Sequence, residues 1–374
     1  MTAANAGIEA FMLDAASEAT VNFPRQRLRA ELSRMATSIS SGLNYDYSAQ
    51  TLASTRANFD RSWEIFTDVA LRPTFASEDV NRVRERIVLS LRDDNDTPDS
   101  YLQVLQARVA YAGHPYVNDP NGTVESVSRL TPEDLRRYHK EMMVTSRLLL
   151  VVVGDLDPQL LRQRIAASFG KLPRGKYKPT PLPELSFDGP TVAVTERDLP
   201  TNYVQGVFAA PGLASPDVYP MRVVTSILQT RLFLEIRQKR NLSYAPDAFL
   251  WSQGANLGGV SVSSTDANQS VRIMLDEIAR LQREPISAAE LQGMAQHYLT
   301  RYYLGQETNA AQAGELAQYE LLGGGWRNSA VYMEKIRAVT AADVQRVAQK
   351  YMHNLRFVVL GNPKSVDTKV FTGS

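Results

Sequence analysis

Residue types that could carry chemistry are scarce in this chain of 374 residues. It contains no cysteine and only four histidines: His114, His139, His297 and His353. A zinc-peptidase helix needs two histidines one turn apart on one face, with a catalytic glutamate beside them. No two of these histidines lie within four residues of each other. The sequence also has no nucleophile-elbow or phosphate-loop pattern, so the residues alone indicate no complete catalytic centre.

One segment combines a cation and a phenol at a spacing that could bind a ligand. Arg237 and Tyr244 are seven residues apart, on either side of a helix end that we expect near Asn241, a residue type that tolerates the left-handed conformation of a C-cap. A guanidinium and a phenol beside one pocket could hold a peptide carbonyl or stabilise an oxyanion. A structural interpretation is also open, because basic residues near a helix C-terminus interact favourably with the helix dipole.

The elements that would position these residues occur in two copies, about 210 residues apart. Ser54-Thr55-Arg56-Ala57-Asn58 recurs as Ser264-Thr265-Asp266-Ala267-Asn268, and Thr131-Pro132-Glu133-Asp134 recurs as Thr340-Ala341-Ala342-Asp343. Thr131 and Thr340 are each predicted to cap a helix that leads into an apolar strand. These predicted strands are residues 148–153 and 357–360. Further strand pairs are expected around Gly42 and between Phe249 and Ser263.

The repeat predicts an α+β fold with two homologous domains, each a mainly antiparallel sheet covered by helices. We expect the first domain at residues 1–170, a stiff proline-rich linker at 171–190 and the second domain at 191–374. Two predicted strands, 192–194 and 204–208, precede the first helix of the second copy. In the first copy the corresponding helix begins at about Ile8. The first domain is therefore predicted to lack its N-terminal strands, either because the sequence is truncated or because another chain completes the sheet.

Composition argues against two classes of partner. The net charge is +1, so no basic field attracts nucleic acid. The apolar run from Leu148 to Val153 is the longest in the chain and is far too short for a membrane span. We expect neither a nucleic-acid partner nor a membrane span. The first residues show no secretory signal, and a bacterial periplasmic or cytoplasmic location would both be compatible with this sequence.

These motifs resemble the M16 zinc peptidases, a family that includes pitrilysin, insulinase and the mitochondrial processing peptidase. Residues 232–244 are similar to the family's second-domain signature, in which an Arg and a Tyr seven residues apart bind substrate; Arg237 and Tyr244 occupy those positions. His114-Pro115-Tyr116, Leu130-Thr131, Asp134-Leu135 and Val151-Val152-Val153-Gly154-Asp155 resemble its first-domain pattern. The likeness extends over nearly the whole chain, including the duplication and the linker.

The zinc motif departs from the family's pattern. Active members carry His-x-x-Glu-His on the first helix and a further Glu ligand downstream. Ala10, Leu13, Asp14 and Ser90 occupy those four positions here. Alanine and leucine cannot bind zinc, and one aspartate cannot hold a divalent transition metal alone. A general base that would activate water is missing as well.

The resemblance therefore implies a non-catalytic subunit that contains no metal and has no peptidase activity alone. Zinc is expected only in a partner subunit of the same family, in a hetero-oligomer to which this chain supplies Arg237 and Tyr244 for binding peptide substrate. Self-association is the other possible arrangement. The alternative is a scaffold protein that reuses the fold with no role in proteolysis, as core subunits of respiratory complexes do.

Overall fold

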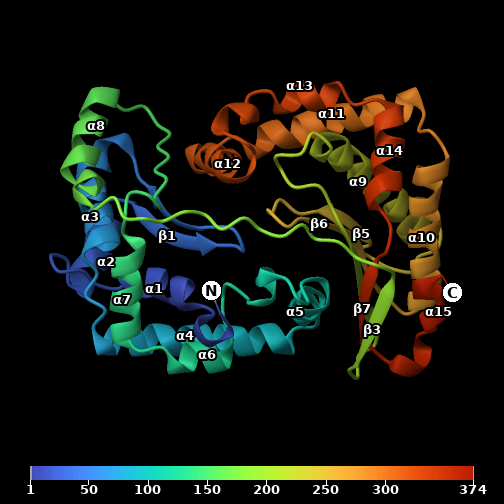
Figure 1. Cartoon of the computed structure of the whole chain (residues 1–374), viewed down its shortest axis with the longest axis horizontal. Coiled ribbons are helices and arrows are strands. Elements are labelled where there is room, and N and C mark those ends of the chain that lie inside the picture. The colour runs from blue at the N-terminus through green and yellow to red at the C-terminus, as the bar shows by residue number, and fades with distance from the viewer. Residues whose placement is uncertain (1, 374) are drawn as a thin grey trace. The chain divides into compact units, whose positions relative to one another are not determined.

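The computed structural model describes residues 2–373, apart from the side chain of Ala295, and these residues form two compact units (Figure 1). Unit 1 consists of residues 2–94 and 118–181. Unit 2 consists of residues 95–117 and 182–373. No helix in this described part is both long and apolar enough to cross a membrane.

Unit 1 is mainly helical. Its helices are α1 (Ile8–Ala16), α2 (Arg25–Arg34), α3 (Phe59–Leu71), α4 (Ser77–Asp96), α6 (Val124–Arg129), α7 (Pro132–Met142) and α8 (Pro158–Ala167). The one sheet among its described residues is an antiparallel hairpin of β1 (Ser38–Leu43) and β2 (Ser48–Ala53). Phe11 and Met12 of α1 pack in an apolar cluster with Val80, Val127 and Leu135, so α1 is a core element of this unit.

Unit 2 contains a five-stranded sheet in the order β3-β7-β4-β6-β5. The strands are β3 (Thr191–Glu196), β4 (Asn202–Ala209), β5 (Asp247–Leu250), β6 (Leu257–Ser264) and β7 (Arg356–Gly361). Only β3 and β7 pair in parallel, and the other neighbours are antiparallel. The predicted α+β fold with mainly antiparallel sheets and helical cover is thus confirmed, and in unit 2 the sheet is complete enough to have a central strand, β4, and an edge strand, β5.

Helices cover both faces of this sheet. The helices of unit 2 are α5 (Pro98–Ala110), α9 (Val218–Leu232), α10 (Ala267–Arg283), α11 (Ala288–Gly305), α12 (Asn309–Leu322), α13 (Tyr332–Arg337), α14 (Ala341–Tyr351) and α15 (Thr368–Thr372). Phe357 and Val359 of β7 pack in the large apolar cluster that includes α9, α10 and α14. Val358 and Leu360 point to the opposite face, where Leu102 of α5 covers them. The short segment 95–117 therefore belongs with unit 2, although the sequence places it in the first copy.

The duplicated helix starts have the predicted geometry. Thr131 Oγ1 accepts a hydrogen bond from the N–H of Asp134, and Thr340 Oγ1 accepts one from the N–H of Asp343, both at 3.2 Å. Each Asp side chain in turn accepts from the N–H of its Thr. These are reciprocal capping boxes, and they begin α7 and α14 at equivalent points of the two copies.

Two strand predictions differ from the structure. The first hairpin turns at residues 44–47 rather than at Gly42, because the Asn44 side chain accepts hydrogen bonds from the N–H groups of Asp46 and Tyr47. Residues 148–153 were predicted to form a strand, but they make no strand ladder with any residue in 2–373. The corresponding strand in unit 2, β7, has a partner on each side.

Asp217 joins the start of α9 to α14. Its carboxylate accepts hydrogen bonds from Arg346 Nη1 (2.7 Å), Lys350 Nζ (2.9 Å) and Tyr351 Oη (2.8 Å). Burial alone would raise the pKa of Asp217, but the donors from Lys350, Arg346 and Tyr351 outweigh it and lower the pKa to about 2. A carboxyl with a depressed pKa stabilises the fold above its unfolded-state pKa, and that contribution is lost as the pH falls through the folded-state value.

Asp217→Asn should lower the free energy of unfolding of unit 2 by about 2 kcal/mol at pH 7. The difference from the wild type should stay constant above about pH 5 and narrow as the pH falls from about 4 to 2. Denaturant unfolding across this pH series measures it. Asp198→Asn, at an exposed aspartate of the same unit, is the control and should match the wild type throughout. A difference that does not depend on pH would contradict this role of Asp217.

Gly206 lies at the centre of β4, where it pairs with Val260 on one side and Phe357 on the other. A Cβ atom built there would overlap the ring of Phe357, which is fully buried. The ring can move aside only by disturbing a close-packed core. The glycine is thus required by packing between neighbouring strands.

Gly206→Ala should destabilise unit 2 by roughly 1–3 kcal/mol, the usual cost of overpacking a core. Gly189→Ala is the matched control, since a Cβ at Gly189 meets no atom within 4 Å, and its effect should stay within about 0.5 kcal/mol. Thermal or denaturant unfolding of the two variants measures the difference. Equal stabilities would show that the β4–β7 contact is looser than described.

Candidate functional site

The end of α9 positions the first predicted site residue, Arg237. The helix continues into a π-helical turn, η5 (Phe233–Gln238), in which the N–H of Lys239 reaches back to the carbonyl of Leu234 at 2.9 Å. Asn241 then adopts a left-handed conformation with φ of 53°, which asparagine tolerates better than most residues. The helix therefore ends where the sequence predicts. The π-helical turn has no clear sequence signal, and such turns occur frequently at functional sites.

The loop that carries Tyr244 is fixed on both sides of this residue. Ser264 Oγ of β6 donates to the carbonyl of Leu242 at 3.0 Å. Gln229 of α9 donates to the carbonyl of Pro246 at 3.3 Å and accepts from the N–H of Ala248 at 2.5 Å. The backbone is thus held by a helix and a strand. The side chain of Tyr244 projects outward, and the residue is 78% exposed.

The structure brings Arg237 and Tyr244 together. Arg237 Cζ lies 4.0 Å from the centroid of the Tyr244 ring and 5.0 Å from that of Phe233. A guanidinium at this distance from an aromatic ring is attracted to it by the cation–π interaction. The two predicted residues therefore form a contacting pair, and Phe233 is an additional member that the spacing argument did not identify.

Arg237 differs from the other basic residues of this helix end in its electrostatic environment. Lys239 and Arg240 both bind Glu235, whose pKa their hydrogen bonds lower. Arg231 is paired with Glu277 and Glu290. Within residues 2–373, the side chain of Arg237 makes no hydrogen bond or ion pair, so its contacts with the rings of Phe233 and Tyr244 leave the guanidinium N–H donors available to a ligand.

The positions of the zinc motif do not fit a zinc ion. Leu13 is buried in the apolar cluster of unit 1, and Asp14 makes an ion pair with Arg86 at 3.5 Å. Burial raises the pKa of Asp14 against the opposing attraction of Arg86. Ala10 has no donor atom, and Ser90 is an exposed residue of α4. Among the described residues, no three or more His, Cys, Asp or Glu side chains are grouped so that they could hold a metal.

Glu9, next to the motif position Ala10, is a polar centre that sequence reasoning missed. Its carboxylate accepts hydrogen bonds from Ser48 Oγ, from Tyr138 Oη at 2.6 Å and from Arg147 Nη2 at 3.0 Å. These donors come from β2, from α7 and from the residue just before segment 148–153. Glu9 is therefore committed to joining elements of unit 1, and its carboxylate is not available as a free general base.

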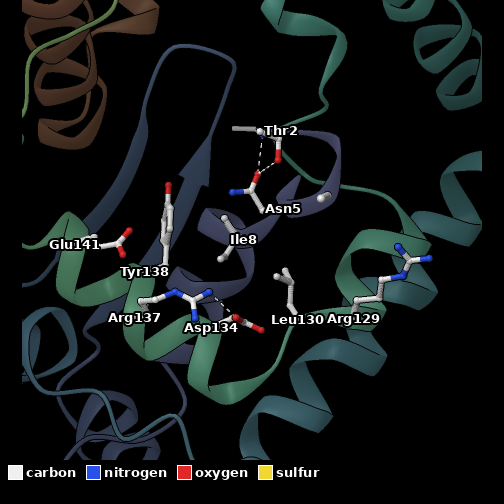
Figure 2. Close-up of a pocket in the computed structure, with 10 residues that line it drawn as sticks. Thr2, Asn5, Ile8, Arg129, Leu130, Asp134, Arg137, Tyr138 and Glu141 are labelled. Carbon is white, nitrogen blue, oxygen red and sulfur yellow. Dashed lines mark hydrogen bonds and ion pairs between the residues drawn. The ribbon is translucent and has the colours of Figure 1, made fainter.

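A surface pocket of about 420 Å³ lies beside α1 and α7 in the same unit (Figure 2). Ile8 and Leu130 form its apolar part, and Figure 2 shows Arg137 directed at Asp134, with which it makes an ion pair at 2.6 Å. The pocket contains no histidine. It offers mixed polar and apolar surface but no set of metal ligands.

His114 makes structural contacts within unit 2. Its Nδ1 accepts a hydrogen bond from the N–H of Tyr116 at 3.1 Å, so the neutral ring carries its proton on Nε2, which lies 3.3 Å from the carbonyl of Pro183. The ring is buried and packs edge-on against Tyr116. All three residues belong to unit 2, where the histidine stabilises the packing of 95–117.

Known proteins resemble this chain in sequence and in fold. A family model described as Peptidase M16 inactive domain matches residues 129–297. An uncharacterized zinc protease of Mycobacterium tuberculosis is 24% identical over 298 residues, covering 76% of this chain and 68% of that protein. The mitochondrial-processing peptidase subunit beta of Lentinula edodes is 24% identical over 324 residues, covering 79% and 68%.

The fold agrees as well. A crystal structure of a peptidase M16 inactive domain from Pseudomonas fluorescens superposes with a TM-score of 0.88 at 16% identity, covering 96% of this chain and 89% of that one. The chain is thus similar to peptidase M16 proteins in sequence over residues 129–297, and it shares their fold over almost its whole length.

Proposed function

We propose that this chain is a non-catalytic M16 subunit that binds peptide substrate and supplies Arg237 and Tyr244 to a zinc-bearing partner subunit. The observation that carries the proposal is the state of Arg237. It is a cation without a counter-ion among the described residues, placed against the ring of an exposed tyrosine at 4.0 Å. A structural arginine at a helix end would be expected to pair with the nearest carboxylate, but Glu235 is taken by Lys239 and Arg240.

This pair suits a carbonyl on which negative charge develops. The Arg237 guanidinium offers several N–H donors in one plane, while the phenol of Tyr244 can add an O–H donor. Donors that are already oriented cost no reorganisation when the oxyanion forms. The anchoring of residues 242–248 by Ser264 and Gln229 supplies that orientation. The partner subunit would supply zinc, which acts as a Lewis acid and activates water.

An edge strand next to the pair offers a way to hold an extended peptide. Within residues 2–373, β5 pairs with β6 alone, and it begins three residues after Tyr244. Extended peptides commonly bind by adding a strand to such an edge, with main-chain hydrogen bonds giving affinity. In this proposal β5 aligns the peptide and Tyr244 lies beside one of its carbonyl groups.

Reconstitution tests the proposed subunit role. The chain alone should show no chelator-sensitive peptide cleavage, and mixing it with a zinc-motif M16 homologue from the same genome should give activity. Tyr244→Phe removes one donor and should lower kcat of the mixture by roughly a hundredfold, the lower range for loss of an oxyanion donor. Tyr303→Phe, at another exposed tyrosine of unit 2, should leave it unchanged.

Other outcomes of the same reconstitution argue against the proposal. If Tyr244→Phe and Tyr303→Phe give equal activity, Tyr244 has no catalytic contribution. If the chain binds the homologue but leaves cleavage unaltered, it is a scaffold subunit with no role in proteolysis.

Arg237→Lys examines the planar donor set separately from charge. Lysine keeps the cation but loses the fork geometry and the flat contact with the ring. The variant should retain assembly with the partner and lose at least about tenfold in kcat/KM. Arg240→Lys is the control, because lysine can still pair with Glu235. A variant at Arg237 that is as active as this control would show that only the charge matters.

A further inference from the structure

Two aromatic rings stand side by side on one face of the edge strand β5. The rings of Phe249 and Trp251 are stacked, with centroids 5.5 Å apart and an interplanar angle of 24°. The Phe249 ring also lies over Gly259 of β6, since a Cβ atom built there would be 2.6 Å from the Phe249 Cζ. Leu250, between the two aromatic residues, packs instead against the large apolar cluster on the other face. The two rings therefore form an aromatic ledge, Phe249 with Trp251, outside that cluster.

The helical cover on the ledge side of the sheet ends before it reaches β5. The register across β6 and β4 places Phe249 on the same face as Val358 of β7. On that face Leu102 of α5 packs with Val358, and Tyr203 of β4 borders the same cluster. Among residues 2–373, no residue of β5 or β6 belongs to this cluster. Aromatic side chains that are not used in a core are typical of binding surfaces, so the ledge is suited to apolar side chains of a ligand.

The backbone of β5 has hydrogen-bonding groups left over at its open edge. The N–H of Trp251 donates to the carbonyl of Leu257 at 2.9 Å. Because the residues that bond to the partner alternate along an antiparallel pair, Ala248 and Leu250 direct their N–H and C=O groups away from β6. The N–H of Ala248 is bound by the Gln229 side chain at 2.5 Å. The carbonyl of Ala248 and both groups of Leu250 make no hydrogen bond within residues 2–373.

Two side-chain amides close this open stretch at its ends. Gln229 also donates to the carbonyl of Pro246 at 3.3 Å, so its amide lies along the edge where β5 begins. Beyond the strand, Gln318 of α12 donates to the carbonyl of Ser252 at 3.2 Å. The stretch between these two amides can pair with about three residues of an added strand, the middle one opposite Leu250.

The ledge and the open stretch coincide. Residues directly opposite each other in paired strands have their side chains on the same face of the sheet. An added strand with its middle residue opposite Leu250 therefore places the side chains before and after that residue against Phe249 and Trp251. We propose that this edge selects extended peptides in which one residue of any type is flanked by two apolar residues, whose side chains pack on the ledge. This inference rests on the proposed peptide binding at β5 and names the class of peptide that the site accepts.

Two peptides of equal composition test the alternation. The probe is acetyl-Lys-Ser-Phe-Thr-Phe-Ser-Lys-amide, which reads the same in both strand directions. The control is acetyl-Lys-Ser-Phe-Phe-Thr-Ser-Lys-amide, whose adjacent phenylalanines point to opposite faces of a strand. Calorimetric titration of the chain alone should give a Kd at least about tenfold lower for the probe, because only the probe buries both rings on the ledge.

Variants of the chain locate the selection at the ledge. Phe249→Ala and Trp251→Ala should each weaken binding of the probe at least about tenfold, the effect of losing one large apolar contact. Trp326→Ala, at an exposed tryptophan of the same unit, should bind as the wild type does. Ledge variants that bind as well as Trp326→Ala would overturn the inference.

The wild-type chain gives a decision that does not depend on how the variants fold. Equal Kd values for probe and control would overturn the inference, and so would a lack of binding of either peptide at millimolar concentration. These titrations need no zinc-bearing partner. A preserved preference for the probe in a mixture that fails to cleave peptides would refute the proposed subunit role alone. Cleavage of both peptides with equal kcat/KM and equal Kd would refute the ledge alone.

Discussion

Backbone pairing of the strands is the constraint on which the rest of this structure depends. A strand's N–H and C=O groups must find partners if the strand is to be buried. In unit 2, β7 and β4 pair their backbone N–H and C=O groups with each other, and side chains cover both faces of β7. β6 pairs with the other edge of β4, and β5 pairs with β6. The loop bearing Tyr244 is anchored to β6 through Ser264. The geometry of the site thus derives from the completed sheet.

Because the chain is duplicated, the same apolar run can be compared with and without neighbouring strands. Both copies have the same capping box before the strand position, with Thr131 and Asp134 in one and Thr340 and Asp343 in the other. Both continue into an equally apolar run. Only the run with neighbours on both sides forms a strand. Local sequence therefore determines where an apolar run lies, and tertiary partners determine whether it becomes part of a sheet.

This contrast also shows what the sequence could and could not predict. Helix starts such as those at Thr131 and Thr340 were predictable because their caps are local. The hairpin turn was misplaced because the Asn44 side chain, rather than Gly42, organises it. No local signal marks the transfer of residues 95–117 to unit 2, since it depends on contacts with β7, more than 200 residues away.

The site itself was predictable in part for the same reason. A spacing of seven residues across a helix end allowed Arg237 and Tyr244 to meet, and they do. That Arg237 would lack a counter-ion could not be deduced, because Glu235 lies only two residues away. The structure shows that Lys239 and Arg240 occupy that carboxylate. The unpaired charge on Arg237 results from competition for one carboxylate among three basic residues within positions 235–240, which a pattern of residue types does not resolve.

The residues that stand at the zinc-ligand positions of α1 contribute to the packing of unit 1. Leu13 lies in the apolar cluster with Phe11 and Met12, and Asp14 pairs with Arg86. A glutamate at position 13 would place a carboxylate among these side chains, where an unpaired charge costs several kcal/mol. The first helix therefore serves as a core element in this chain. Restoring a metal site would require rebuilding the cluster around α1 as well as replacing the four motif residues, whereas the Arg237–Tyr244 pair stands on an exposed helix end that packing leaves free.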